Sequence, residues 1–322
     1  MKWKTRLTEM LGIKYPIIQG AYAGFGTSKI AVPVSEAGGL GIITAGALKT
    51  PEALREDIRR AKALTDKPIG VNLSVGICPK IDEMREVAIE EGISVVETAA
   101  YKATDHGKRL KEAGVKWIHK VATVKHAIIA EKQGVDAVVI VGLEGVGFKS
   151  VDQLPTLTNI TWAAKKIKIP IIAAGGIGDA RGFLAALVMG ADGVYMGTAF
   201  MATKECPITM RHKQFLVDTA PNDPKLIKKV LTPPDPGQLG KVMKQKGKIP
   251  HAAWRTKLEM VLSKEDPEQE QSFESEEVLR VAPGSLAVSA IDKIVDVKDL
   301  INGIVNGAEE ILNSDVFSNV RT

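Results

Sequence analysis

Residues 169–198, IPIIAAGGIGDARGFLAALVMGADGVYMGT, decide the fold of this chain. An apolar run over residues 171–174 ends at a glycine pair, which predicts a short buried strand. Asp179 then provides a capping side chain, and the apolar residues after it recur at spacings of three and four, which predicts a helix as far as Gly190. Residues 193–196 predict a second strand. The stretch is therefore one strand–helix–strand unit with a glycine turn after each strand.

The two glycine turns predict a phosphate clamp. Glycine lets backbone N–H groups approach an anion closely, and in (β/α)8 barrels a phosphate site lies after strands seven and eight. Either turn alone is equally compatible with an ordinary strand-to-helix connection, whereas two turns one strand–helix unit apart favour the clamp. The turn residues are Gly175, Gly176, Gly197 and Thr198.

Length and composition bound the class of protein. The chain has 322 residues, of which 45% are hydrophobic and 25% charged, as expected for a globular protein with one large domain and an addition, or with two domains. No apolar run approaches the roughly 18 residues of a membrane span, and the first residues lack a signal-peptide core, so we expect a cytoplasmic protein without membrane contact. The net charge of +5 with 5% aromatic residues argues only weakly for nucleic acid, and none is expected.

Cysteine and histidine usage bounds the chemistry of the site. Cys78 and Cys206 are too few and too far apart to suggest a disulfide scaffold or a structural zinc site. No histidine pair shows metal-ligand spacing with a carboxylate, so we predict no metal. His119 lies inside an expected strand, and its side chain faces either the barrel or the helices.

Strands and helices alternate along the first two thirds of the chain. We expect strands at residues 15–20, 40–44, 68–73, 95–98, 116–121, 137–141, 171–174 and 193–196, separated by helices. Such alternation means parallel strands with helical crossovers. Eight repeats favour a closed (β/α)8 TIM barrel, with an open doubly wound sheet as the alternative, and a barrel carries its chemistry on the loops that follow its strands.

The composition of the sequence changes after the last expected strand. Residues 221–250 are rich in Pro, Gly and Lys, residues 265–277 are strongly acidic, and helical periodicity returns over residues 286–312. We therefore divide the chain into a barrel, residues 1–219, and a mostly helical C-terminal cap over the barrel mouth, residues 220–322. The lysines of the second part are either a solvated surface or a dock for an anionic carrier such as coenzyme A or acyl carrier protein.

Several stretches resemble the nitronate monooxygenase family, formerly called 2-nitropropane dioxygenase, which includes the flavin-dependent enoyl-acyl-carrier-protein reductases. These stretches are TRLTEMLGIKYPIIQG, VSEAGGLGIIT, LTDKPIGVNL, GVKWIHKVATVKHAIIAEKQGVDAV, IPIIAAGGIGDARG and MGTAFMATKECPI. They occur in order and cover about residues 5–215, most of the expected barrel, whereas the C-terminal third matches only loosely.

The resemblance implies that the barrel binds FMN at the carboxyl ends of its strands. The loop that begins at Gly20 would lie along the isoalloxazine ring, and Asn72 would hydrogen-bond the flavin. Lys120 would place a cation where the reduced flavin carries its negative charge, although a lysine at a strand end is on its own more simply a surface residue. The implied cofactor-binding residues are Gly20, Ala21, Tyr22, Asn72, Ser74, Lys120, Gly142, Val146, Ala174, Gly175, Gly176, Gly197 and Thr198.

After the sixth strand the chain departs from the family pattern. The family carries a Glu-x-x-Gly-His run whose histidine transfers the proton near flavin N5, whereas residues 142–150, GLEGVGFKS, align Phe148 with that histidine. Phenylalanine neither donates nor accepts a proton. The candidates to replace it are Glu144, Lys149 and Tyr22. The plainer alternatives for these three are a structural hydrogen bond, a solvent-facing lysine and packing against the flavin ring.

The resemblance implies an FMN-dependent oxidoreductase that oxidises alkyl nitronates with oxygen. A nitronate arrives already deprotonated, so the missing histidine does not forbid this reaction. The alternative is an NAD(P)H-dependent flavin reductase that acts on an enoyl thioester or a quinone, and a third reading is a non-catalytic flavin-binding protein. The expected ligand is a small molecule, with coenzyme A or an acyl-carrier thioester as a further partner, and the sequence leaves a homodimer open.

Overall fold

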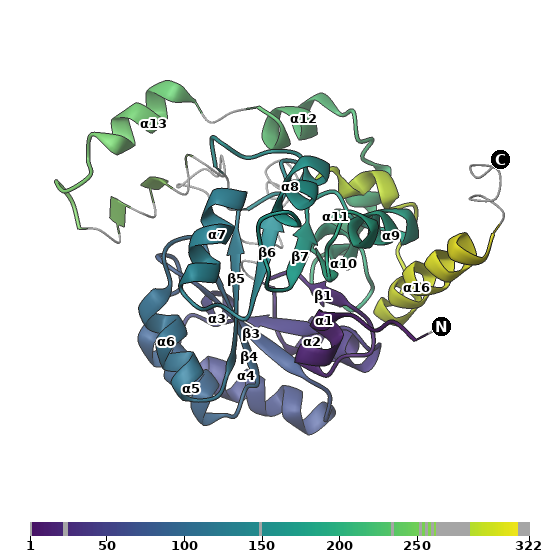
Figure 1. The fold of residues 1–322 in the computed structure, drawn as a ribbon, viewed down its shortest axis with the longest axis horizontal. Coiled ribbons are helices and arrows are strands. Elements are labelled where there is room, and N and C mark those ends of the chain that lie inside the picture. Colours follow the sequence, from purple (N-terminus) through teal and green to yellow (C-terminus); the bar gives the residue numbers. More distant parts are fainter. Residues whose placement is uncertain are drawn as a thin grey trace.

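The computed structural model places eight parallel strands in one sheet, in the order β1-β8-β7-β6-β5-β4-β3-β2 (Figure 1). It describes residues 2–21, 25–147, 150–232, 235–250, 253–254, 257–258, 261 and 284–314. The strands are β1 (Ile17–Gln19), β2 (Gly41–Thr44), β3 (Ile69–Ser74), β4 (Val95–Ala99), β5 (Lys116–Val121), β6 (Ala137–Val141), β7 (Ile171–Ala174) and β8 (Gly193–Met196).

The sheet closes on itself between β1 and β2. Ile18 of β1 forms a parallel bridge with Leu40, directly before β2, and the Gln19 amide donates to the Leu40 carbonyl at 2.9 Å. All strand pairs in the sheet are parallel, as the alternation of strands and helices predicts. The expected (β/α)8 TIM barrel is confirmed, and the open doubly wound sheet is excluded.

Helices surround the barrel (Figure 1). They are α1 (Arg6–Leu11), α2 (Ser28–Glu36), α3 (Ala45–Leu48), α4 (Pro51–Leu64), α5 (Ile81–Glu90), α6 (Thr104–Glu112), α7 (Val124–Lys132), α8 (Thr156–Ala163), α9 (Ala180–Val188), α10 (Thr198–Met201), α11 (Met210–Asp218), α12 (Pro224–Val230), α13 (Pro236–Met243), the 3-10 helix η1 (Leu286–Ala290) and α16 (Val297–Asn313). The helices that alternate with β1–β8 occur where the sequence predicts them, whereas α1 was not expected.

An apolar cluster fills the barrel interior, and α1 closes the amino-terminal end of the barrel. Successive strand residues point to opposite faces, so one set of side chains, including Ile42 and Val139, fills the interior, and the other packs under the helices. Leu7 of α1 belongs to the interior cluster. A Cβ at Gly193 of β8 would lie 2.4 Å from Leu7 Cδ2, so this glycine makes room for the plug. The interior is therefore filled at its amino-terminal end, so a ligand site is expected at the carboxyl ends of the strands.

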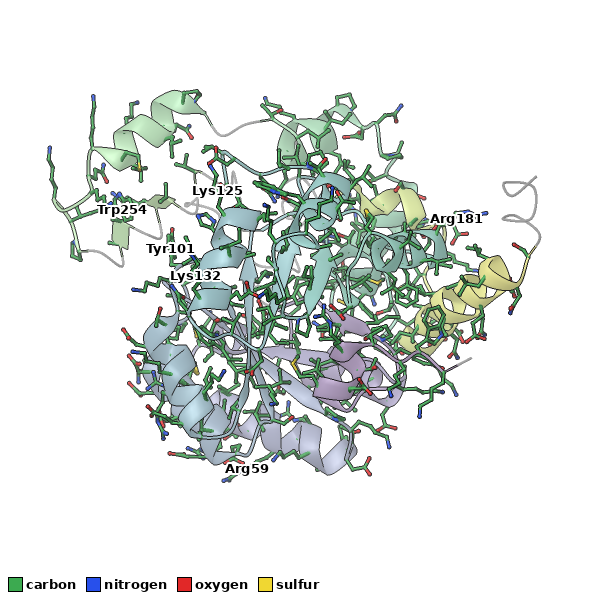
Figure 2. All side chains as sticks on the ribbon, in the orientation of Figure 1. Arg59, Tyr101, Lys125, Lys132, Arg181 and Trp254 are labelled. Atoms are coloured by element: carbon green, nitrogen blue, oxygen red, sulfur yellow. The ribbon has the colours of Figure 1, made fainter. Side chains whose placement is uncertain are left out.

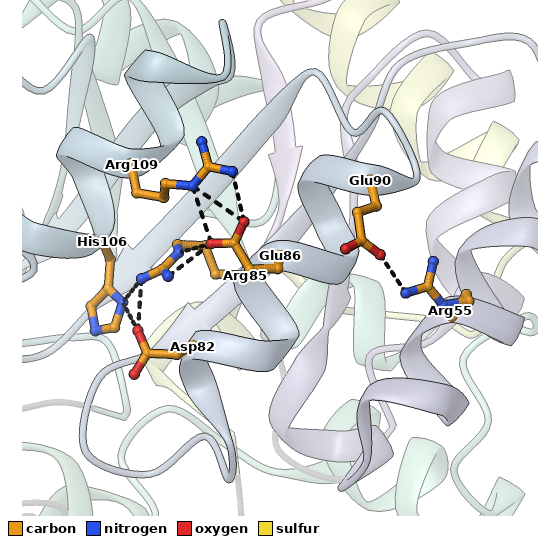
Figure 3. Close-up of polar contacts among 7 residues, drawn as sticks. All are labelled: Arg55, Asp82, Arg85, Glu86, Glu90, His106 and Arg109. Atoms are coloured by element: carbon orange, nitrogen blue, oxygen red, sulfur yellow. Dashed lines mark hydrogen bonds and ion pairs between the residues drawn. The ribbon is translucent and has the colours of Figure 1, made fainter.

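Ion pairs tie neighbouring helices of the ring together (Figure 3). Arg109 of α6 donates to Glu86 of α5 at 2.8 Å, and Arg85 donates to the same carboxylate at 2.9 Å. Burial alone would raise the pKa of Glu86, but these hydrogen bonds outweigh it and hold that pKa below its ordinary value. Arg55 of α4 pairs with Glu90 of α5 at 2.5 Å. Exposed pairs of this kind contribute at most about 1 kcal/mol each, so they adjust helix positions and do not determine the fold.

The C-terminal helix α16 lies on the outside of the barrel, beside α9 and α2 (Figure 1). Trp3 donates to Glu309 of α16 at 3.1 Å and packs edge-on against Phe183 of α9, with ring centroids 5.1 Å apart. A Cβ at Gly307 would lie 2.9 Å from Ala180 Cβ, so α16 and α9 approach closely. The sequence grouped this helix with a cap over the barrel mouth, but these contacts place it in the helical ring. The boundary at residue 219 otherwise stays a prediction.

The outward faces of the ring helices carry exposed charges (Figure 2). Examples are Arg59 on α4, Lys125 and Lys132 on α7, and Arg181 on α9. Among the helices of the described ranges, none combines the length and the apolar character needed to cross a bilayer. The apolar faces of these helices are turned to the barrel.

Candidate active site

A pocket of about 110 Å³ lies at the carboxyl ends of the strands, between the loops after β1, β5, β6, β7 and β8. Its lining includes much of the cofactor set implied by the sequence: Gly20, Ala21, Lys120, Val146, Ala174, Gly175, Gly176, Gly197 and Thr198. It also includes Tyr195 and Ser285, which the sequence did not single out. In TIM barrels this face carries the chemistry.

A larger cavity, of about 460 Å³, lies at the opposite end of the barrel. Its lining comes from the end of α2, from the loops after α1 and α2, from Lys67 and Pro68 before β3, and from Lys298 and Asn302 of α16. In TIM barrels this amino-terminal face of the strands serves stability, whereas the opposite face carries the chemistry. We therefore place the candidate site in the smaller pocket.

One wall of the pocket is bare backbone. Gly175 and Gly176 follow β7 with φ of 105° and 73°, a left-handed region that side chains rarely adopt. A Cβ at Gly175 would lie 3.0 Å from Thr156 Oγ1, and one at Gly176 would lie 3.1 Å from Glu144 Cβ. Because no side chain stands between the backbone and the pocket, N–H groups here are able to approach an anion. This end of the pocket fits a phosphate group.

The same end is completed by a segment from far along the chain. Ser285 precedes η1, and its Oγ lies 2.8 Å from Thr198 Oγ1, while its amide donates to Thr198 Oγ1 at 3.0 Å. The next amide, that of Leu286, donates to the Glu144 carbonyl at 3.0 Å. Two hydroxyls therefore stand beside the glycine turns, and hydroxyl groups are suitable phosphate ligands.

The other end of the pocket carries a cation and a phenol. Lys120, at the end of β5, lies with its Nζ 5.0 Å from the centroid of the Tyr195 ring and 3.5 Å from the Tyr195 hydroxyl. The Ala21 amide donates to that hydroxyl at 2.7 Å, which fixes the start of the loop after β1. A cation and a hydroxyl at this end fit the polar edge of a flavin ring.

Behind Lys120 and Tyr195 lies a buried carboxylate. Glu97 of β4 is 1% exposed, and its Oε2 accepts from Asn72 at 2.6 Å and from the Tyr195 hydroxyl at 3.1 Å. Its Oε1 has no hydrogen-bond partner and lies 3.9 Å from Lys120 Nζ. Burial raises the pKa of Glu97, although Lys120, Asn72 and Tyr195 all favour its ionised form. A carboxyl group therefore lies beside the lysine directly behind the pocket wall.

The sequence model of a family described as nitronate monooxygenase matches residues 4–307. The chain belongs to the nitronate monooxygenase family. The match includes the barrel, the segment that carries Ser285 and most of α16, so it covers all the parts that build the pocket. The protein is therefore an oxidoreductase, and the flavin chemistry of the family agrees with a pocket that has a phosphate end and a cationic end.

Individual proteins support membership of the nitronate monooxygenase family. A (3aS,4S,5R,7aS)-5-hydroxy-7a-methyl-1-oxo-octahydro-1H-indene-4-carboxyl-CoA dehydrogenase from Mycobacterium tuberculosis is 37% identical over 209 residues, which are 65% of this chain and 58% of that protein. The chain thus spans less than two thirds of that relative. A probable nitronate monooxygenase of Staphylococcus aureus is 36% identical over 245 residues, 63% of this chain and 69% of that protein.

Solved structures match over nearly the whole chain. The structure of FabK from Thermotoga maritima has a TM-score of 0.77 and 32% identity, and the match covers 99% of this chain and 98% of that one. A nitroalkane oxidase from Streptomyces ansochromogenes has a TM-score of 0.71 over 95% of this chain and 98% of that one; at 22% identity it supports the fold alone. The arrangement of barrel, η1 and α16 is thus found in known proteins.

Of the expected catalytic residues, Phe148, Lys149 and Tyr22 lie outside the described residues. The carboxylate of Glu144 accepts from the Thr156 amide at 2.9 Å and from the Thr156 hydroxyl at 2.8 Å, at the first turn of α8. This is the geometry of a helix cap, and it favours the structural alternative for Glu144. The proton-transfer roles of these residues stay predictions.

Three residues of the implied cofactor set lie just behind the part of the pocket lining that the structure describes. Asn72 is fully buried and donates to Glu97, and Ser74 donates to Asn72 Oδ1 at 3.0 Å. A Cβ at Gly142 would lie 2.0 Å from Thr156 Oγ1, so this glycine allows α8 to approach β6. They support the lining from behind.

Sequence reasoning missed Glu97, Tyr195 and Ser285. Glu97 and Tyr195 each interrupt an apolar strand, in VVETA and GVYM, and a polar residue at an interior strand position is a signal for a functional group. His119, whose direction was left open, faces the helices, where its Nδ1 lies 2.8 Å from Thr98 Oγ1. Burial lowers the pKa of His119 to about 4, so it is neutral and lies outside the pocket.

Proposed function

We propose that the protein is an FMN-dependent oxidoreductase that oxidises alkyl nitronates with oxygen as the acceptor. The observation that carries the proposal is the pocket at the barrel mouth, with a glycine-backbone wall at one end and Lys120 beside Tyr195 at the other. FMN, when bound, would supply electron transfer between substrate and oxygen. The family match and the FabK structure support the same cofactor.

Different residues of the pocket would bind different parts of the cofactor. The backbone around Gly175 and Gly176, with the hydroxyls of Thr198 and Ser285, would hold the phosphate. Lys120 would hold a positive charge near the polar edge of the ring, where it favours the reduced, negatively charged state. Tyr195 would fix the loop after β1 through the Ala21 amide, so that the ring is shielded from water.

The proposed preference for nitronates rests on Phe148. At the position that the family fills with histidine, phenylalanine neither accepts nor donates a proton. A nitronate is already deprotonated and needs no base, whereas a neutral nitroalkane does. The sequence therefore favours nitronates over nitroalkanes as substrates.

A second candidate is NAD(P)H-dependent reduction of an enoyl thioester or a quinone. It is favoured by the CoA thioester in the name of the Mycobacterium tuberculosis relative and by the extent of the FabK match. The lysines of residues 221–250 would then receive coenzyme A or an acyl carrier. A cytoplasmic location, a homodimer and the division into residues 1–219 and 220–322 are parts of the same proposal.

Anaerobic mixing of the purified, FMN-loaded protein distinguishes these functions. Bleaching of the flavin absorbance by a nitronate, with no bleaching by NADH or NADPH, supports the first. Bleaching by a nicotinamide followed by reoxidation with an enoyl thioester or a quinone supports the second. A preparation that binds no added FMN contradicts both, and a flavin that none of these compounds reduces points to a non-catalytic protein.

A further inference from the structure

Glu97, the buried carboxylate beneath the ring end of the pocket, has no role in the reactions proposed above. Among the described residues that line the pocket, Lys120 and Tyr195 contact Glu97, which is not itself part of that lining. The three side chains come from β4, β5 and β8, and all point to the barrel interior. Interior positions at this level of a barrel are normally filled by apolar or small side chains, so the carboxylate requires an explanation.

The geometry shows which neighbour Glu97 acts on. Its Oε2 is satisfied by Asn72 from β3 and Tyr195 from β8. Its Oε1, buried and without a hydrogen bond, faces Lys120 Nζ of β5 at 3.9 Å. This distance allows a strong Coulombic interaction without a hydrogen bond, and screening by water is weak because the Glu97 side chain is 1% exposed and that of Lys120 is 14% exposed.

The opposing charge changes what Lys120 offers to a flavin. A cation alone stabilises a ring that gains negative charge, and a neighbouring anion weakens that stabilisation. The anion also keeps the ammonium group against the Tyr195 ring, where its Nζ lies 5.0 Å from the ring centroid.

We propose that Glu97 is a positioning residue that acts through Lys120: it holds the ammonium group at the pocket wall, offsets part of its charge and thereby sets the reduction potential of the bound flavin. The inference rests on the proposed FMN site. It goes beyond that site because it assigns a role to a residue that need not touch cofactor or substrate.

The test compares the midpoint potential of bound FMN in the wild type with that in Glu97→Gln, Lys120→Met and the double variant, by reductive titration against a reference dye. Glu97→Gln removes the negative charge 3.9 Å from Lys120 Nζ, so reduced flavin should be favoured by about tenfold, which is about 30 mV to the positive side for a two-electron couple. Lys120→Met should shift the potential in the negative direction. In the Lys120→Met background, Glu97→Gln should change the equilibrium between oxidised and reduced flavin by less than about threefold.

Two controls separate this role from general damage. Asp57 is also a buried carboxylate, 3% exposed, but it serves Ser28 on the outside of the barrel, so Asp57→Asn should leave the potential unchanged. Glu97→Asp keeps the charge, so the equilibrium between oxidised and reduced flavin in this variant should stay within about threefold of the wild type. If Glu97→Gln does not fold, Glu97→Met replaces it: methionine removes the carboxylate and has a similar volume, so the same shift of about tenfold is expected, and an unchanged potential overturns the proposal.

The pH dependence provides a further readout that a purely structural residue would not move. Burial raises the pKa of Glu97, so its carboxyl group loses its proton at a higher pH than an ordinary glutamate, and the effect of Glu97→Gln should grow as the pH rises. The groups that face Glu97 are Lys120, Tyr195 and Asn72. An unchanged potential in Glu97→Gln, or an equal shift with and without Lys120, overturns the inference while FMN binding stands. Loss of FMN binding by the wild type would instead contradict the proposed function.

Discussion

Replacement of Gly176 by alanine tests the phosphate end of the pocket most directly. The alanine would have to adopt φ of 73°, which costs an L-residue roughly 1–2 kcal/mol. Its Cβ would lie 3.1 Å from Glu144 Cβ, closer than the 3.5–4.0 Å of a comfortable carbon contact, so the Glu144 side chain would have to move. The methyl group would also disturb the backbone wall where the phosphate is proposed to bind.

The magnitude for binding follows from the hydrogen bonds at stake. A hydrogen bond to a charged group contributes about 1.5–3 kcal/mol, so the loss of one amide–phosphate contact should weaken FMN binding by about 10- to 150-fold. Titration of apoprotein with FMN, followed by flavin fluorescence, measures this change. Urea unfolding measures the backbone strain separately.

Gly114 provides the matched control. It has φ of 75°, nearly the same as Gly176, and a Cβ there would have no heavy atom within 4 Å. Gly114→Ala should therefore lose a similar roughly 1–2 kcal/mol of unfolding free energy and keep the FMN affinity of the wild type. If folded Gly176→Ala binds FMN within about threefold of the wild type, or if Gly114→Ala weakens binding equally, the phosphate assignment is wrong.

Four further outcomes are expected. The pKa of His119 is about 4 in the folded protein against 6.5 in the unfolded chain, so its contribution to the free energy of unfolding is present above pH 6.5 and is lost as the pH falls. Between about pH 7 and about pH 5 the wild type should therefore lose about 2 kcal/mol of unfolding free energy that His119→Asn does not lose, measured by urea unfolding. Glu144→Gln should keep turnover within about threefold and cost about 1 kcal/mol of unfolding free energy, because the carboxylate caps α8; loss of turnover would restore it as a catalytic group. Ser285→Ala should weaken FMN binding by about two- to tenfold, and Ser289→Ala, an exposed serine on η1, should not. Phe148→His should raise the rate on neutral nitroalkanes more than on nitronates, and an equal effect on both would contradict the alignment of that residue.

The barrel was predictable because its signals are local. Each strand is a short apolar run, most end at a glycine or a polar residue, and the observed strands agree with the expected ranges to within a few residues. The six residues of α1 were missed because a helix so short carries little periodicity, and its role as a plug depends on contacts with Gly193, far along the chain. Local pattern thus predicts the elements, and long-range packing decides which of them close the barrel.

The site was predictable where backbone chemistry decides it, and not where strand register does. The glycine turns after β7 and β8 follow from the sequence alone. The interaction of Glu97 with Lys120 and Asn72 depends on the pairing of β4 with its neighbours, in which Asn72 lies opposite Glu97 and Ala99 lies opposite Lys120. Ser285 reaches Thr198 only because η1 returns to the barrel mouth, and the two residues lie 87 positions apart in the chain.

The energetics of the buried pair argue for a functional origin. Removing a carboxylate and an ammonium group from water costs several kcal/mol per ion, and replacing such a pair with apolar side chains of similar volume is often neutral or stabilising. The interior below Glu97 is apolar, with Val95 and Ile118 on the same two strands, so an apolar residue at position 97 would extend that packing. Stability alone therefore does not account for Glu97. Glu97 lies directly behind two residues that line the pocket, and this position accounts for it, because ionisable groups with strongly perturbed pKa values cluster at functional sites.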